Sequence, residues 1–271
     1  MIVMTAKMAM PAPARTPTRA DITGILSILA KRPLPRICLV LMIPAEASPQ
    51  RIPDANAHGW FMYFGDHPVK GRWGAHMEGQ YRRHNIVTRW QQLLLRPAVN
   101  YELNRSVMLT GGYAFVKTHG YGAFPVPAAF PEHRLFEQLL ARHRAGRVSL
   151  QHRFRLEQRW IGVTTAEVRR PASWRSQQRF RYFIKGTIPL GGTSPWFLAG
   201  YNEILLHFGS NYGASAFDHN RAYGALGYTV NRFTRIEVGY LNQYLYQRSG
   251  RSLENNHTLQ FSVFSTLPLG K

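Results

Sequence analysis

The sequence predicts an all-β protein that folds as an antiparallel, up-and-down transmembrane β-barrel of 10–12 strands. Three observations lead to this expectation. Apolar and polar residues alternate with a period of two over most of the chain after residue 55. Short and long connections also alternate along the chain. The alternating segments run to roughly 10–16 residues, longer than the five or six usual in soluble sheets and long enough for a tilted strand to cross a bilayer.

The N-terminal part of the chain has the residue order of a secretory signal. Lys31, Arg32 and Arg36 form a cationic cluster, residues 37–43 are apolar, and Ala45-Glu46-Ala47 follows as a small-residue cleavage site. Cationic, apolar and small-residue segments in this order are typical of signal peptides. Cleavage is therefore expected after Ala47, although a short buried helix or strand would also fit the apolar run.

The expected domain organisation follows from this signal. Residues 1–47 form the leader and signal peptide, 48–57 an N-terminal extension, and 58–271 the β-barrel domain. The single cysteine, Cys38, lies in the leader. An internal disulfide and a site with several cysteine ligands are therefore excluded.

Each strand is expected where the alternation is clearest. In residues 72–82 one face carries Trp73, Ala75, Met77, Gly79 and Tyr81. The other face is mostly polar, as side chains pointing to opposite sides of a strand require. The same reasoning gives strands at 59–66, 72–84, 88–103, 106–118, 133–144, 147–161, 178–190, 195–207, 220–230, 233–246 and 256–268. Residues 133–144 could alternatively form a short helix. Because bacterial single-chain barrels have even strand numbers, ten or twelve strands are expected rather than these eleven.

The connections favour a membrane barrel. Tight turns are expected at Asn104-Arg105, Ala145-Gly146, Leu190 to Pro195 and Asn231-Arg232, and longer links at 117–132, 162–177, 208–219 and 247–256. Outer-membrane barrels have short periplasmic turns and long extracellular loops. An outer-membrane location is therefore expected, with membrane lipid, lipopolysaccharide and the barrel-assembly machinery as partners.

The strongly basic composition has two explanations. The formal net charge is +20, and 13 % of the residues are aromatic. A soluble, basic, nucleic-acid-binding β protein would have such a charge. However, alternation places neighbours such as Arg179 and Phe180 on opposite faces, which suits a membrane wall better than a nucleic-acid surface. No nucleic-acid partner is expected, and several tryptophans are expected in interfacial girdles.

In a barrel of this kind the polar face of each strand lines the lumen. Arg153, Arg155, Glu157 and Arg159 form one inward row, and Arg179 and Arg181 follow on the next strand. Glu78, Glu102, Glu203, Arg235 and Glu237 are expected partners. These groups either hold the barrel interior together or attract an anionic solute, because arginine pairs well with carboxylate and phosphate.

Evidence for catalysis is weaker. His207, Ser210 and Asn211 resemble the base, nucleophile and orienting group of a lipid hydrolase, but they lie at a strand end in a polar loop. No spacing of His, Asp or Glu indicates a metal site, and no glycine-rich phosphate loop is present. No cofactor or metal is expected, and an enzyme is the less favoured interpretation.

Several stretches resemble a family of bacterial outer-membrane barrels, domain of unknown function family 2490. They are Trp60 to Phe64, Gln80 to Arg83, Gln91 to Arg96, Gly112 to Phe115, His152 to Arg159, and Phe217 to Arg221 leading to Gly227-Tyr228. The resemblance covers roughly 58–268, and Arg155 to Arg159 is its most specific part. It implies an outer-membrane barrel and no particular reaction. The chain departs from many barrels by ending in Leu269-Gly270-Lys271 rather than an aromatic residue.

The sequence therefore predicts an outer-membrane barrel with a structural or pore-like role and an Arg/Glu-lined lumen. A lipid-active outer-membrane hydrolase and a soluble nucleic-acid-binding protein are the alternatives.

Overall fold

The computed structural model describes residues 52–122, 126, 128–165, 170–248 and 252–270. The expected leader and its cleavage site lie outside these residues. Within them, no helix is long and apolar enough to cross a bilayer.

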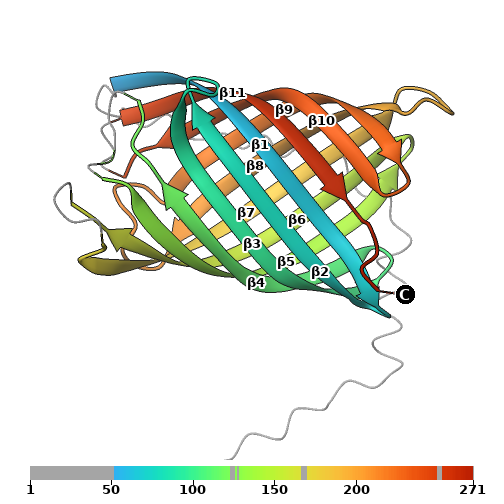
Figure 1. Cartoon of the computed structure of the whole chain (residues 1–271), viewed down its shortest axis with the longest axis horizontal. Helices are drawn as coiled ribbons and strands as arrows, with labels where there is room; N and C mark the ends of the chain where they lie inside the picture. Colours follow the sequence, from blue (N-terminus) through green and yellow to red (C-terminus); the bar gives the residue numbers. More distant parts are fainter. Residues whose placement is uncertain (1–51, 123–125, 127, 166–169, 249–251, 271) are drawn as a thin grey trace, which may run out of the picture. The chain divides into compact units, whose positions relative to one another are not determined.

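The described residues form eleven strands that close into a barrel (Figure 1). The strands are β1 Ile52–Lys70, β2 Trp73–His84, β3 Arg89–Asn104, β4 Val107–Thr118, β5 Phe130–Ala145, β6 Val148–Val163, β7 Ser173–Pro189, β8 Trp196–Phe208, β9 Phe217–Asn231, β10 Thr234–Tyr246 and β11 Ser252–Ser265. Each strand pairs with its neighbours in the chain, and β1 pairs with β11 to complete the closure.

The closure corrects the expected even strand number. With eleven described strands in an up-and-down order, the first and the last run in the same direction. They consequently pair in parallel, from Ile52 opposite Ser252 to Gly65 opposite Ser265. All other pairings are antiparallel. A parallel seam satisfies the edge hydrogen bonds as an antiparallel one does, so parity is no physical requirement for closure.

The barrel has two different ends. We call the end with the links 71–72, 105–106, 146–147, 190–195 and 232–233 the turn end, and the opposite end the loop end. Strands β1 and β11 are parallel, so both begin at the loop end and both finish at the turn end. The alternation of short and long connections expected from the sequence is thus present.

Most strands begin and end near the expected residues. The segment 133–144, for which a helix was an alternative, lies within strand β5. The largest difference is at β1, which begins at Ile52 rather than at 59. Residues 52–57 pair with β11 and therefore belong to the first strand, although the sequence suggested an extension before it.

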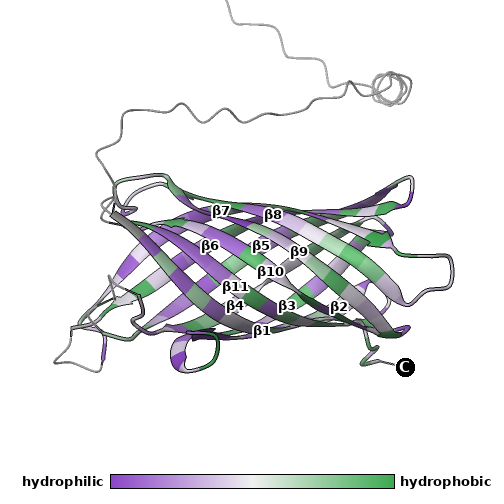
Figure 2. Ribbon diagram, turned by 90° about the horizontal axis from the view of Figure 1, so that it is seen from above, coloured by the Kyte–Doolittle hydropathy of each residue, from purple (hydrophilic) through white to green (hydrophobic). Residues whose placement is uncertain are grey.

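Polar and apolar side chains alternate along the strands (Figure 2). On β3, Leu95 is 50 % exposed on the outer face, whereas the next residue, Arg96, is 2 % exposed inside. Figure 2 shows the same alternation of hydrophobic and hydrophilic residues along other strands. The barrel therefore turns its apolar side chains outward and its charged side chains inward.

The β2–β3 connection at the loop end requires a glycine on β1. Asn85 and Ile86 both have positive φ, 49° and 64°, and Asn85 N–H donates to Ala57 O (2.8 Å). This brings the Ile86 carbonyl so close to Gly59 that a Cβ there would lie 2.1 Å from its oxygen. Only glycine at 59 allows this approach.

We expect Gly59→Ala to lower the unfolding free energy by about 1–3 kcal/mol, the usual cost of overpacking. Urea unfolding of the purified protein measures this. Gly79→Ala is the matched control, since a Cβ at 79 meets no atom within 4 Å. Equal stability of the two variants would contradict the close approach.

Candidate functional site

The outer wall carries aromatic side chains near both ends of the strands. At the turn end Trp73 packs on Tyr101, with 4.7 Å between ring centroids, and Trp196 packs on Tyr228 at 4.8 Å. At the loop end Tyr81 meets Trp90 at 5.0 Å. Trp160 and Trp174 are also exposed near that end. Two such girdles are typical of barrels that span a bilayer.

The girdles are separated by a suitable distance. Trp90 and Tyr101 are both outward residues of β3, eleven positions apart. At about 3.3 Å per residue and a tilt of about 40°, they lie about 28 Å apart along the barrel axis. Leu93, Leu95 and Val99 lie between them on the same face, so the wall presents an apolar band of the thickness of a hydrocarbon layer.

Buried charged side chains occupy the inside of the barrel. We call this set the interior charge network; it consists of Glu78, Glu132, Glu157, Glu203, Arg96, Arg134, Arg153, Arg155, Arg159, Arg179, Arg181 and Arg221. Their side chains are 0–13 % exposed. Alternation on β2, β3 and β5–β9 puts these residues on the inner face of the wall.

Glu157 on β6 lies at the centre of the network. One of its carboxylate oxygens accepts hydrogen bonds from Arg179 (2.5 Å), and the other accepts one from Arg181 (2.7 Å). Arg96 reaches the same carboxylate from β3 at 3.5 Å, although β4 and β5 lie between β3 and β6 in the wall. Arg96 also donates to Glu78. The network therefore crosses the lumen as well as following the wall.

The contacts continue around the barrel to the parallel seam. Glu203 on β8 accepts from Arg181 at 2.6 Å and from Arg221 on β9 at 3.1 Å. The Arg221 guanidinium lies 5.3 Å from the ring of Trp60 on β1, and Arg82 on β2 lies over the same ring at 3.9 Å. Side chains from both sides of the seam thus meet at Trp60.

Side chains fill the barrel at this level. Trp60, Arg155 and Glu157 are each 1 % exposed, and Leu241 is fully buried. Trp60 and Leu241 form an apolar cluster with Met62 and Tyr223 next to the charges. These inward side chains are therefore packed against one another and shielded from water.

The network holds twice as many arginines as glutamates. Its eight arginines face four glutamates, and several guanidinium nitrogens, including Arg155 Nη1, Arg153 Nε and Arg221 Nε, have no hydrogen-bond partner among the described residues. Buried donors without partners are costly. The network therefore carries a net positive charge and favours anionic groups.

All six residues expected to line the lumen lie inside the barrel. Arg153 donates to Glu203 (2.7 Å), Arg155 to Gln138 (2.6 Å) and Arg159 to Glu132 (2.5 Å), and Glu157, Arg179 and Arg181 meet as described above. A role in binding a ligand stays a prediction for all six.

The expected partners divide into two groups. Glu78 and Glu203 belong to the interior charge network, and Glu237 pairs with Lys185 at 2.5 Å. Glu102 and Arg235 are instead exposed near the turn end. Both residues lie near the ends of their strands, where an inward position in the alternation is no longer covered by other side chains.

The three weak catalytic candidates make separate contacts, and their catalytic role stays a prediction. His207 Nε2 lies 3.4 Å from Asp218, whereas no hydrogen bond between described side chains joins His207 to Ser210. Ser210 is exposed, and the backbone carbonyl of Asn211 accepts a hydrogen bond from Arg248 (2.7 Å).

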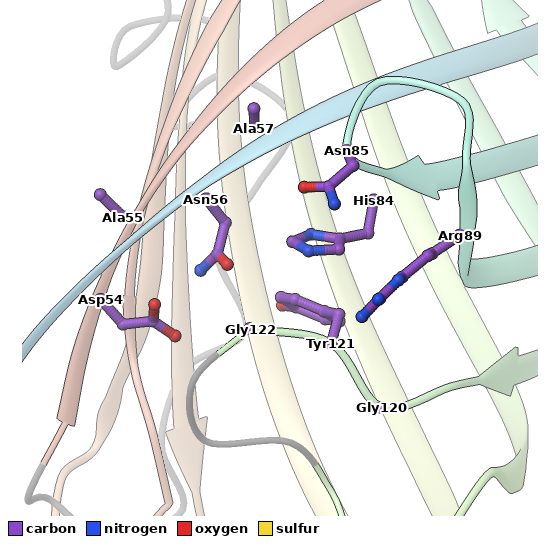
Figure 3. Close-up of a pocket in the computed structure, with 10 residues that line it drawn as sticks. All are labelled: Asp54, Ala55, Asn56, Ala57, His84, Asn85, Arg89, Gly120, Tyr121 and Gly122. Atoms are coloured by element: carbon purple, nitrogen blue, oxygen red, sulfur yellow. The ribbon is translucent and has the colours of Figure 1, made fainter.

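A pocket of about 560 Å³ opens at the loop end, next to the parallel seam (Figure 3). Tyr121, from the link between β4 and β5, donates to Glu254 Oε2 at 3.0 Å and packs against His84 at 5.6 Å. Burial beside the Glu254 carboxylate raises the pKa of Tyr121, so its hydroxyl stays protonated as a donor. Asn56 and Arg89 also line the pocket.

The sequence analysis missed parts of the interior charge network and the whole of the loop-end pocket. The sequence analysis assigns no role to Arg82 or Arg96, although the alternation that selects Arg155 applies to them as well. The expectation that several tryptophans lie in interfacial girdles does not extend to Trp60, which is buried inside the barrel. The pocket depends on contacts between the loop with Tyr121 and β1, β2 and β11, which no local pattern indicates.

No group of three or more His, Cys, Asp or Glu side chains in the described ranges could hold a metal ion.

Comparisons with known proteins identify similar proteins and a family. An uncharacterized protein of Methylorubrum extorquens is 28 % identical over 192 residues, covering 69 % of this chain and 78 % of the relative. Among solved structures, a NanC porin aligns with a TM-score of 0.43 and 12 % identity, covering 73 % of this chain and 92 % of that chain. The family described as "Protein of unknown function (DUF2490)" matches residues 57–254, and this chain belongs to it.

Proposed function

We propose that this protein is an outer-membrane β-barrel whose lumen is closed at rest by the interior charge network, with a structural role rather than that of an open pore. The observation that carries the proposal is the burial of Glu157 between Arg179, Arg181 and Arg96, which joins opposite parts of the wall. Lipid and lipopolysaccharide cover the outer band, and the barrel-assembly machinery inserts the chain.

Two features support the membrane location. The aromatic girdles bound an apolar band of suitable thickness, and the inside is more polar than the outside. A soluble barrel would bury its apolar side chains centrally and expose its arginines. The interior charge network has a net charge of +4 (eight arginines and four glutamates) out of the formal +20, and we assign the remaining excess to loops and lipid headgroups rather than to a nucleic-acid surface.

Conductance of the purified protein in planar lipid bilayers tests the closed state. We expect no stepwise current from the unmodified barrel. Replacing Arg155, Glu157 and Arg181 together by alanine removes the side chains that cross the lumen. This variant should produce steps that favour anions, since the remaining interior charge is positive.

Heat-modifiable gel migration provides the control that each variant is folded before its current is recorded. Steady open-channel steps from the unmodified protein would overturn the closed state. Extraction of the expressed protein by buffer without detergent would overturn the membrane location, independently of the conductance result.

A further inference from the structure

The pocket at the loop end has the features of a binding site for a small molecule. Its volume of about 560 Å³ lies in the range of ligand pockets, roughly 300–1,000 Å³. The side chains that line it are mostly polar, and Figure 3 shows Asn56, His84, Arg89 and Tyr121 pointing into one space. The pocket therefore suits a hydrophilic ligand.

Two buried polar atoms in the pocket have no partner. Asn56 is 6 % exposed and His84 is 8 % exposed, yet Asn56 Nδ2 and His84 Nδ1 have no hydrogen-bond partner among the described residues. Buried groups of this kind are normally satisfied. No group among the described residues satisfies these two atoms, which leaves them for a ligand with acceptor atoms.

Arg89 supplies positive charge at the same place. It lies directly opposite His84 in the β2–β3 pairing, which puts both side chains on the same face of the wall. The Arg89 side chain is exposed and makes no hydrogen bond or ion pair with any other described residue. Its guanidinium is therefore available for a carboxylate, which it can bind through two parallel hydrogen bonds.

The opposite side of the pocket carries negative charge. The Asp54 carboxylate lies across the pocket from Arg89 (Figure 3), and Glu254 accepts the hydrogen bond from Tyr121. The loop approaches Asp54 closely because residue 122 is glycine with φ +73°; a Cβ there would lie 2.7 Å from Asp54 Oδ2. A second anionic group on the ligand would face these acids, whereas hydroxyl groups could donate to them.

We propose that this pocket binds a small polyhydroxylated monocarboxylate. Its carboxylate pairs with Arg89 and accepts hydrogen bonds from Asn56 Nδ2 and His84, and its hydroxyl groups face Asp54. The site lies outside the interior charge network and does not depend on whether the lumen conducts. It places an anionic solute at the loop end rather than among the buried arginines.

Isothermal titration calorimetry of the full chain in detergent micelles tests the proposal. Sodium gluconate is the probe, and glucitol, which has the same carbon skeleton without the carboxylate, is its neutral counterpart. We expect gluconate to bind at least about tenfold more tightly than glucitol, as a charge-assisted hydrogen bond to arginine implies. Inorganic phosphate should bind more weakly than gluconate.

Variants identify the site. Arg89→Gln should weaken gluconate binding by about tenfold or more, and Asn56→Asp should do the same by replacing a donor with a negative acceptor. Arg105→Gln is the matched control: Arg105 is exposed in a link at the turn end, and its loss changes the net charge equally. It should bind gluconate like the unmodified protein.

Heat-modifiable migration shows whether each variant is folded. Absence of gluconate binding by the unmodified protein, equal binding of glucitol, tighter binding of phosphate, or unchanged affinity in folded Arg89→Gln would each overturn the proposal. None of these results bears on membrane insertion or conductance.

Discussion

Replacing Glu157 by glutamine should destabilise the barrel by about 3–5 kcal/mol, the cost of removing one partner from a buried ion pair. The Glu157 side chain is fully buried and accepts hydrogen bonds from Arg179 and Arg181. Glutamine has nearly the same volume but no charge. The two arginines would then remain buried with too little negative charge beside them, and water could not easily compensate.

Urea unfolding of the barrel in phospholipid vesicles measures this effect. Glu102→Gln is the control, because Glu102 is exposed near the turn end of β3 and lies outside both the interior charge network and the apolar band. Its replacement should change the unfolding free energy by less than about 0.5 kcal/mol. A loss below about 1 kcal/mol in Glu157→Gln would mean that the network does not hold the interior together.

A charge placed in the middle of the apolar band should have a comparably large effect. Leu95 is 50 % exposed on β3, midway between Trp90 and Tyr101. Leu95→Arg should lower the unfolding free energy in vesicles by about 2–4 kcal/mol, as expected for arginine facing lipid at the bilayer midplane. In water, an arginine at so exposed a position would be tolerated.

Leu103→Arg tests whether the loss of stability depends on the depth of the arginine in the bilayer rather than on the substitution itself. Leu103 is 41 % exposed near the turn end of the same strand, beyond Tyr101. The same substitution should cost only about 0–1 kcal/mol there, because the guanidinium reaches the interface. Equal effects at the two positions would show that the outer face does not lie in a hydrocarbon layer.

Much of the architecture could be predicted from the sequence because each strand of the wall must have one apolar face and one polar face. Where one face meets lipid and the other meets charged partners, alternation shows which side chains point inward, as for Arg155 and Glu157. The same alternation identifies the side chains that point outward, such as Leu95. The same argument explains the confirmed barrel of β-strands.

The argument fails where both faces of a strand are apolar. On β1, Trp60, Met62 and Phe64 point inward, while Phe61 and Tyr63 point outward. Alternation cannot orient such a strand, so it does not predict that Trp60 lies inside the barrel.

The parallel seam and the loop-end pocket were missed for a different reason. Both depend on contacts between segments far apart in the chain, such as Tyr121 with Glu254. Strand number parity was also taken as a rule, although closure requires only that the edge hydrogen bonds are satisfied. Local patterns therefore predict the individual strands of the wall, but not the pairing of β1 with β11 or the contacts that form the pocket.

The most direct test of this account is the environment of Leu95. In a Cys38→Ser background, a fluorescent label attached at Leu95→Cys should be quenched by brominated lipid chains and protected from aqueous iodide. A label at Ser194→Cys, in the link between β7 and β8, should show the reverse. Quenching of the Leu95 label by iodide but not by brominated lipid would show that the outer face meets water, which contradicts a membrane-spanning barrel.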